Sequence, residues 1–204
     1  MTMLPEVFVI ESLRKEDHAA GRLEGSLITQ LLKMGGRHPR YNLVEGYDQF
    51  VSAITQFVES QYRYLHLSCH GSGNSFEFYF GSMTFERFIG LVHDKLENRR
   101  VFISACEAVN DHLANLLIPS SKCYSIIGPF ESIDFDEAAI IWTSYYYLAF
   151  RNDQRVMDRK LIIRTLSALT KLYRINLNYY SLSRSRGVKL KPFIGVSVGA
   201  YQES

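Results

Sequence analysis

Features that would point to a secreted, membrane-bound or disordered protein are scarce in this chain of 204 residues. It has only 3 cysteines, an odd number and too few for a disulfide-built scaffold. Its longest apolar stretch, residues 138–150, is shorter than the roughly 20 residues that span a bilayer. The first residues lack a basic region followed by a long apolar run, so we expect no signal peptide. We therefore predict a cytoplasmic protein in a reducing compartment, without membrane contact.

The composition is that of a globular protein with a full core. Hydrophobic residues make up 47% of the chain, aromatic residues 13% and charged residues 22%, which excludes a disordered chain. The length suits one domain, so we predict that residues 1–204 form a single domain. The polar residues 151–158, between two expected helices, are interpreted as a connection within that domain.

The formal net charge of +2 conceals an uneven distribution. Residues 151–191 contain eleven Arg and Lys against two Asp, a net charge of +9, and the rest of the chain carries −7. Such a basic segment can bind nucleic acid or an acidic partner, or it can be a solvated helix face docked on its own acidic domain. We favour the second interpretation, because the segment lacks a Gly-rich or aromatic RNA-binding signature.

Segments with strand and helix spacing alternate along the chain. Expected helices are residues 17–34, a segment capped by Asp48, a segment starting at Thr84, residues 111–118 ending near Pro119, and residues 135–150 and 158–174. Expected strands are residues 6–12, 41–44, 63–68, 101–105, 123–127 and 193–198, with a hairpin at 76–81. This alternation predicts an α/β fold with a mainly parallel sheet and helices on both faces.

Two expected strands end in residues that can carry chemistry. His70 follows the strand at 63–68, and Cys106 follows the apolar strand at 101–105. Ligands bind at the carboxyl ends of strands in open parallel sheets, where neighbouring ends lie about 5 Å apart. A cysteine and a histidine there suit nucleophilic catalysis, and a helix starting after Cys106 would favour its thiolate. Gly71 leaves room for a substrate backbone, and the N–H groups of Gly71 and Cys106 could hold an oxyanion.

Each of these residues also has a purely structural interpretation. A cysteine after an apolar strand is often a small buried hydrophobe, and we assign Cys69 and Cys123 to that class. His66, in the middle of its strand, is interpreted as a core histidine with hydrogen-bond partners. Spacings typical of zinc ligands, phosphate-binding loops and the GxSxG triad are absent from the sequence, so we expect no metal and no cofactor.

Two segments resemble a known family. LHLSCHGSG (65–73) followed by VFISACEA (101–108) is similar to the caspase-like cysteine peptidases, with the closest resemblance to their CHAT branch, which is related to separase. The resemblance continues more weakly through residues 124–150. It implies a three-layer sandwich with about six strands. It also implies His70 as general base or orienting imidazole and Cys106 as nucleophile, with Gly71 and Cys106 as oxyanion donors.

The resemblance also implies an acidic residue that lines the pocket for the substrate side chain. Asp136 is our first choice and Asp134 the second, and such a carboxylate would select Arg or Lys. For Asp136, a role as helix cap or first-turn acid is equally open. The sequence departs from caspases proper, which carry Gln-Ala-Cys-x-Gly, and Cys106 lies 36 residues after His70 instead of about 50. These departures argue against a strict preference for Asp.

Three functions remain open. The first is a cysteine endopeptidase that cleaves one or few protein partners after a basic residue, controlled by a regulatory or activator chain. Bacterial relatives of this type often serve in antiviral defence, so the resemblance implies that role for this protein as well. The second is an inactive caspase-like regulatory protein, and the third is a nucleic-acid-associated protein acting through residues 151–191. For the first, we expect a latent resting state, with a disordered or misplaced loop near residues 107–111 or 130–137.

Overall fold

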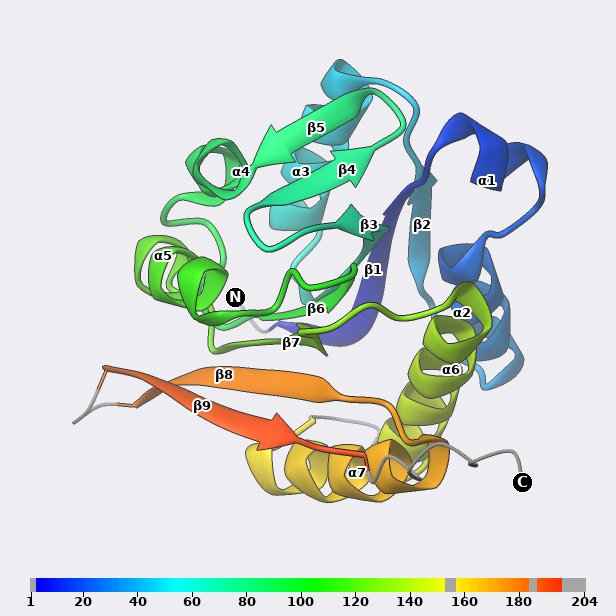
Figure 1. Cartoon of the computed structure of the whole chain (residues 1–204), viewed down its shortest axis with the longest axis vertical. Helices are drawn as coiled ribbons and strands as arrows, with labels where there is room; N and C mark the ends of the chain where they lie inside the picture. Colours follow the sequence, from blue (N-terminus) through cyan, green and yellow to red (C-terminus); the bar gives the residue numbers. More distant parts are fainter. Residues whose placement is uncertain (1–2, 153–156, 184–186, 196–204) are drawn as a thin grey trace, which may run out of the picture.

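Figure 1 shows the fold of the chain in a computed structural model that describes residues 3–152, 157–183 and 187–195. A single sheet runs through it in the order β2-β1-β3-β6-β7-β8-β9, and the hairpin β4–β5 joins the sheet at β3. The strands are β1 (Leu4–Ser12), β2 (Arg40–Leu43), β3 (Tyr62–Gly71), β4 (Ser75–Phe78), β5 (Gly81–Thr84), β6 (Arg100–Ser104), β7 (Ser125–Pro129), β8 (Leu177–Ser183) and β9 (Gly187–Phe193).

Helices cover both faces of the sheet (Figure 1). They are α1 (Lys15–Ala19), α2 (Glu24–Met34), α3 (Tyr47–Glu59), α4 (Phe85–Val92), α5 (Asp111–Ser121), α6 (Phe135–Asn152) and α7 (Arg159–Tyr173). The apolar faces of α3, α4 and α5 pack into one buried cluster, and those of α2, α6 and α7 pack into a second on the opposite face. None of the described helices is both long and apolar enough to cross a membrane.

The parallel centre of the sheet follows from its apolar strands. The pairs β1–β2, β1–β3, β3–β6 and β6–β7 are all parallel. Val101 and Ile103 of β6 pack into one cluster and Phe102 into the other, as a strand buried on both faces requires. The predicted α/β sandwich is therefore confirmed, with a main path of strands close to the predicted number.

Several expected helix boundaries are wrong in detail. The helix predicted over residues 17–34 is two helices, α1 and α2, separated by a turn in which Gly21 has a φ of 71°. Asp48 lies in the first turn of α3, whose N-cap is Gly46, so it is not the cap. Pro119 lies inside α5 instead of ending it, because the helix continues to Ser121 before Lys122 adopts a left-handed conformation.

The end of the chain adds an antiparallel pair that the sequence patterns did not predict. β8 pairs with β7, and β9 pairs with β8, both antiparallel. The strand expected over 193–198 is misplaced, because β9 ends at Phe193, and residues 196–198 lie outside the described part of the chain. Within the basic segment, Tyr179 and Tyr180 are buried, so these two aromatic residues serve packing.

Candidate active site

The sheet brings His70 and Cys106 to the same edge. β3 and β6 are parallel neighbours in which Ser68 is paired with Ser104. Continuing that register by two residues brings His70, near the end of β3, level with Cys106, just beyond β6. The predicted juxtaposition of these two strand ends is therefore present in the fold.

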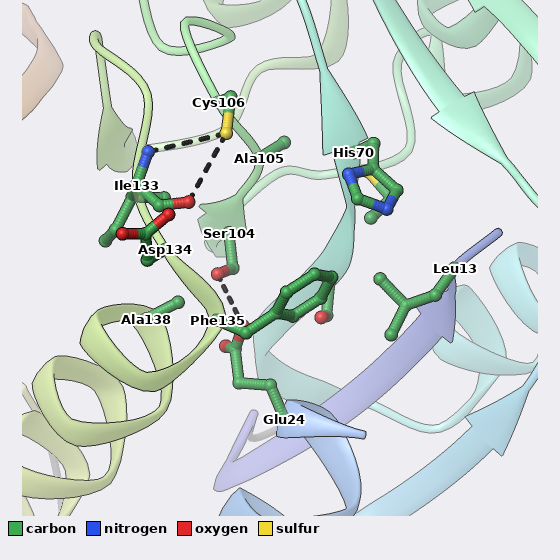
Figure 2. Close-up of a pocket in the computed structure, with 12 residues that line it drawn as sticks. Leu13, Glu24, His70, Ser104, Ala105, Cys106, Ile133, Asp134, Phe135 and Ala138 are labelled. Carbon is green, nitrogen blue, oxygen red and sulfur yellow. Dashed lines mark hydrogen bonds between the residues drawn. The ribbon is translucent and has the colours of Figure 1, made fainter. Parts of the chain in front are cut away.

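His70 and Cys106 line one hollow at the carboxyl ends of the strands (Figure 2). Its volume is about 220 Å³, enough for one long side chain but not for a folded segment. Its walls come from β3, from the residues that end and follow β6, from the start of α2 and from the connection between β7 and α6. The lining residues are Leu13, Glu24, Ser68, Cys69, His70, Ser104, Ala105, Cys106, Ile133, Asp134, Phe135 and Ala138.

The His70 ring is held by a carboxylate from α1. Nε2 of His70 lies 2.7 Å from Oδ2 of Asp17, and Oδ1 of Asp17 accepts a hydrogen bond of 2.8 Å from Arg22. The Phe135 ring meets the imidazole edge-on, with the ring centroids 5.5 Å apart. Side chains from α1 and α6 therefore fix the orientation of the ring and leave Nδ1 for another partner.

The charge of Asp17 decides which nitrogen of His70 carries a proton. Burial by itself would raise the pKa of Asp17, but hydrogen bonds and charge from His70 and Arg22 outweigh it and lower the pKa below its usual value. Asp17 is therefore ionised at neutral pH and can only accept, so Nε2–H of His70 donates to it. In neutral His70 this leaves the lone pair of Nδ1 free to take a proton.

The Cys106 thiol is bound to the main chain of Ile133. The sulfur accepts a hydrogen bond from Ile133 N–H at 3.4 Å, and the thiol donates to Ile133 C=O at 3.6 Å. Figure 2 shows the sulfur turned toward Ile133, with His70 on the other side of the hollow. Within the described chain no hydrogen bond joins Sγ to the imidazole.

The helix that follows Cys106 starts at the predicted residue. α5 begins at Asp111, and Asn110 caps it by accepting a 3.0 Å hydrogen bond from Leu113 N–H. The field of a helix terminus falls off within one turn, and the N-cap of α5 lies four residues after Cys106, so we assign the thiolate no support from this dipole.

A buried carboxylate forms the floor of the hollow. Glu24, the first residue of α2, is 6% exposed. One of its oxygens accepts a 2.8 Å hydrogen bond from Ser104 Oγ, and the other lies 3.1 Å from Nε2 of His66. The second ring nitrogen of His66 contacts the Tyr146 hydroxyl at 3.0 Å, which confirms His66 as a core histidine with partners.

A second buried carboxylate fixes the helix that carries Glu24. Oxygens of Glu11 accept hydrogen bonds from Gly25 N–H at 2.7 Å and from the Tyr41 hydroxyl at 2.7 Å. Burial raises the pKa of Glu11, although these hydrogen bonds oppose the shift. A Cβ at Gly25 would lie 2.8 Å from a Val9 methyl group, so the glycine lets α2 approach β1 closely.

A glycine is needed at position 71 because the residues that follow β6 pack directly against it. A Cβ at this position would lie 2.6 Å from the Cys106 carbonyl oxygen and 3.0 Å from Ala105 Cβ. The space that we had expected to serve a substrate backbone is therefore taken by the residues that follow β6. This close approach holds the His70 and Cys106 segments together.

The two aspartates expected to bind a substrate side chain lie in different places. Asp134 is exposed and lines the hollow beside Cys106. Asp136 is exposed in the first turn of α6 and is not among the lining residues of this hollow; it borders a neighbouring depression that shares Glu24 and Phe135 with it. The structure thus groups Asp134 with His70 and Cys106, and it places Asp136 outside that group.

The other cysteines are packing residues, as predicted. Cys69 and Cys123 are buried, and burial raises the pKa of Cys69 well above its usual value and that of Cys123 to about 11. Both thiols therefore stay protonated and shielded, whereas Cys106 is partly exposed. Among the residues described, no group of three or more His, Cys, Asp or Glu side chains is arranged to hold a metal ion.

Sequence reasoning missed Asp17, Glu24 and Glu11. Asp17 is 53 residues from His70, and Glu24 is 80 residues from Ser104. Only Glu11 carried a signal, because it is a carboxylate that directly follows the apolar run VFVI (7–10), where a charge needs partners.

Comparisons with known proteins support the fold. No protein-family model and no curated protein matches the sequence. Among solved structures, a secreted C11 cysteine protease from Bacteroides thetaiotaomicron, bound to an irreversible peptide inhibitor, is 10% identical with a TM-score of 0.55, over 86% of this chain and 65% of its own. Caspase-1 from Spodoptera frugiperda is 11% identical with a TM-score of 0.54, over 85% and 77%.

A third similar structure is the complex of the pro- and mature domains of RgpB from Porphyromonas gingivalis. It is 14% identical with a TM-score of 0.51, over 83% of this chain and 44% of its own. The chain thus spans less than two thirds of the Bacteroides protease and of RgpB. At these identities the likeness concerns the fold, so the chain has a caspase-like α/β fold.

Proposed function

We propose that this protein is a cysteine endopeptidase in which His70 and Cys106 form the catalytic dyad. One observation carries the proposal: a partly exposed cysteine and a histidine ordered by a carboxylate share one hollow at the strand ends of a caspase-like fold. The similar solved structures include two named as cysteine proteases or caspases, which supports the same class of reaction.

The mechanism follows from the arrangement of the side chains. Nδ1 of His70 takes the thiol proton, and the sulfur of Cys106 attacks the scissile carbonyl carbon. The oxyanion is held by N–H groups, for which we propose Gly71 and Cys106. When the C–N bond breaks, imidazolium His70 gives its proton to the leaving amine. Water, deprotonated by His70, then hydrolyses the thioester and restores the thiol. Asp17 stabilises the imidazolium throughout.

The charge of the hollow supports cleavage after a basic residue. Glu24 on its floor and Asp134 on its rim are carboxylates, and neither Lys nor Arg is among its lining residues. A guanidinium or ammonium group entering the hollow would gain a charge-assisted hydrogen bond in a site shielded from water. We therefore assign the main role in selectivity to Glu24 and a secondary role to Asp134. We assign no role to Asp136, because it does not line this hollow.

The sequence resemblance supports a more specific placement. We propose that the chain belongs to the CHAT branch, works in the cytoplasm on one or few protein substrates, and is controlled by a regulatory or activator chain. A role as an effector of antiviral defence fits such control. The latent state expected from the sequence has a physical counterpart in the Cys106–Ile133 contact.

The test is covalent labelling with a mild peptide electrophile that carries Arg next to the reactive group. Wild type, Cys106→Ala and His70→Ala are compared by intact mass, with an Asp-bearing probe and the exposed-site variant His112→Ala as controls. Labelling of wild type and His112→Ala by the Arg probe alone, lost in the other two, is the expected result. Labelling that survives Cys106→Ala would disprove the dyad.

One observation favours a second function, an inactive caspase-like regulatory protein. The thiol is bound to Ile133 and not to His70, as in a site that has lost its chemistry. This alternative predicts capture of a binding partner that is unchanged in Cys106→Ala, together with no turnover of any peptide.

A further inference from the structure

The connection between β7 and α6, together with Phe135, the first residue of α6, forms one wall of the hollow; these residues, 130–135, are here called the strap. At its start, Val109 N–H donates to Pro129 C=O at 3.0 Å, and Glu107 N–H donates to Glu131 C=O at 3.1 Å. Asn176 Nδ2 donates to the Glu131 carboxylate at 2.9 Å. These contacts tie the strap to the residues that follow the candidate nucleophile.

The strap contacts both candidate catalytic side chains. Its Ile133 peptide group binds the Cys106 sulfur through N–H and C=O together. Its last residue, Phe135, packs edge-on against the His70 ring. The thiol proton is donated to a carbonyl oxygen that cannot take it up, so in this arrangement Cys106 has no base.

The attachment of the strap is weak compared with the core beside it. All six of its residues are exposed or half-exposed, whereas every residue of β7 is buried. Its anchor, Glu107, adopts a left-handed φ of 59°, which costs about 1 kcal/mol for a residue other than glycine. Segments with few buried contacts open at low free energy.

We infer that the strap is an autoinhibitory element of this active site. In the closed state, Ile133 masks the thiol of Cys106. When the strap lifts, Sγ is free to turn toward Nδ1 of His70, which Asp17 already holds in the accepting tautomer. The inference rests on the proposed function for its biological meaning, but the masking of the thiol can be measured without any peptidase activity.

The test measures the second-order rate of alkylation of each cysteine by iodoacetamide in the full chain, resolved by peptide mass. Ile133→Gly combined with Glu131→Ala loosens the strap, and Asn176→Ala removes one anchor from outside it. The control is Met34→Gly, an exposed residue at the end of α2 that is remote from the hollow. Buried Cys123, which does not line the hollow, reports any general loosening of the fold.

We expect Cys106 to react about tenfold faster in the double variant, equivalent to about 1.4 kcal/mol, and faster by a smaller factor in Asn176→Ala. Cys123 should stay protected, and the control should match wild type. An unchanged Cys106 rate in both strap variants, or equal acceleration of Cys106 and Cys123, would overturn the inference.

Turnover of an Arg-containing reporter peptide separates the two proposals. If only the peptidase proposal fails, the alkylation difference persists and no variant cleaves the peptide. If only the strap inference fails, wild type already cleaves the peptide as fast as the strap variants, and the alkylation rates are equal.

Discussion

The two sides of the hollow are held by different kinds of contact. On the His70 side, charged side chains fix the ring, because Asp17 binds Nε2 and is itself bound by Arg22. On the Cys106 side, the main chain of a half-exposed connection holds the sulfur. The first arrangement prepares a base for proton transfer, and the second keeps the proton away from it. The contacts that prepare His70 as a base and the contacts that restrain the Cys106 thiol thus come from separate segments of the chain.

The largest expected effect is at the nucleophile itself. Replacing Cys106 with Ala should abolish turnover of a reporter peptide, because no other partly exposed thiol is present among the described residues. Cys123→Ala, a buried cysteine away from the hollow, should keep activity and lose only about 1 kcal/mol of unfolding free energy. Equal activity of wild type and Cys106→Ala would show that the Cys106 thiol is not the nucleophile.

Glu24, on the floor of the hollow, should decide which substrate side chain is preferred. Glu24→Gln keeps the shape of the side chain but removes its charge, so kcat/KM for an Arg peptide relative to its citrulline analogue should fall about 100-fold. Asp134→Asn should lower that ratio by a few-fold, and Asp136→Asn should not change it. A large effect at Asp136 alone would restore the assignment made from the sequence.

The histidine side is probed by Asp17→Asn. The amide can donate to Nε2 and favour the tautomer whose Nδ1 carries a proton, so kcat/KM should fall about 30-fold with little change in KM. Asp17→Glu should recover part of the loss, which a merely structural role would not predict.

Asp17 also gives a pH signature in stability. Its folded-state pKa is below the usual 3.8, so its contribution to the unfolding free energy is present above pH 3.8 and is lost as pH falls through the folded value. Denaturant unfolding of wild type and Asp17→Asn should therefore differ at pH 5–7, and the difference should shrink as the pH falls below 3.8. A difference that persists unchanged to pH 2 would contradict this assignment.

The smallest expected effect is at Gly71, where the segments that carry His70 and Cys106 touch. In Gly71→Ala, the new methyl group would press on the Cys106 carbonyl oxygen, so the unfolding free energy should fall by about 1–3 kcal/mol. Gly73→Ala has open space around its Cβ and should stay within about 0.5 kcal/mol of wild type. Equal stability of the two variants would mean that the contact is not under compression.

Local patterns predicted the features that depend on short stretches of sequence. The spacing of Phe50, Ile54 and Phe57 predicted α3, and the run VFIS predicted a strand buried on both faces. His70 and Cys106 were found because strand ends in parallel sheets are where ligands bind. Boundaries such as the break at Gly21 and the end of α5 were missed, since neighbouring elements decide them.

β8 was missed for a related reason. Its residues LNYYSLS mix polar and aromatic side chains, and only the partners on either side, β7 and β9, make it a strand. The same limit applies to the residue that selects the substrate side chain. Asp136 was our first choice because it comes after a predicted strand. In the fold, Glu24 lines the hollow and Asp136 does not.

The sequence by itself determined the layered α/β fold and the placement of His70 and Cys106 at neighbouring strand ends, because apolar periodicity and strand ends are local properties. Only the tertiary structure decided which residues serve that pair. Asp17, Glu24 and Ile133 reach the site from α1, α2 and the strap, and their hydrogen bonds span 27 to 80 residues. Such contacts form only when the sheet has set the distance between distant segments, and sequence spacing carries no record of that distance.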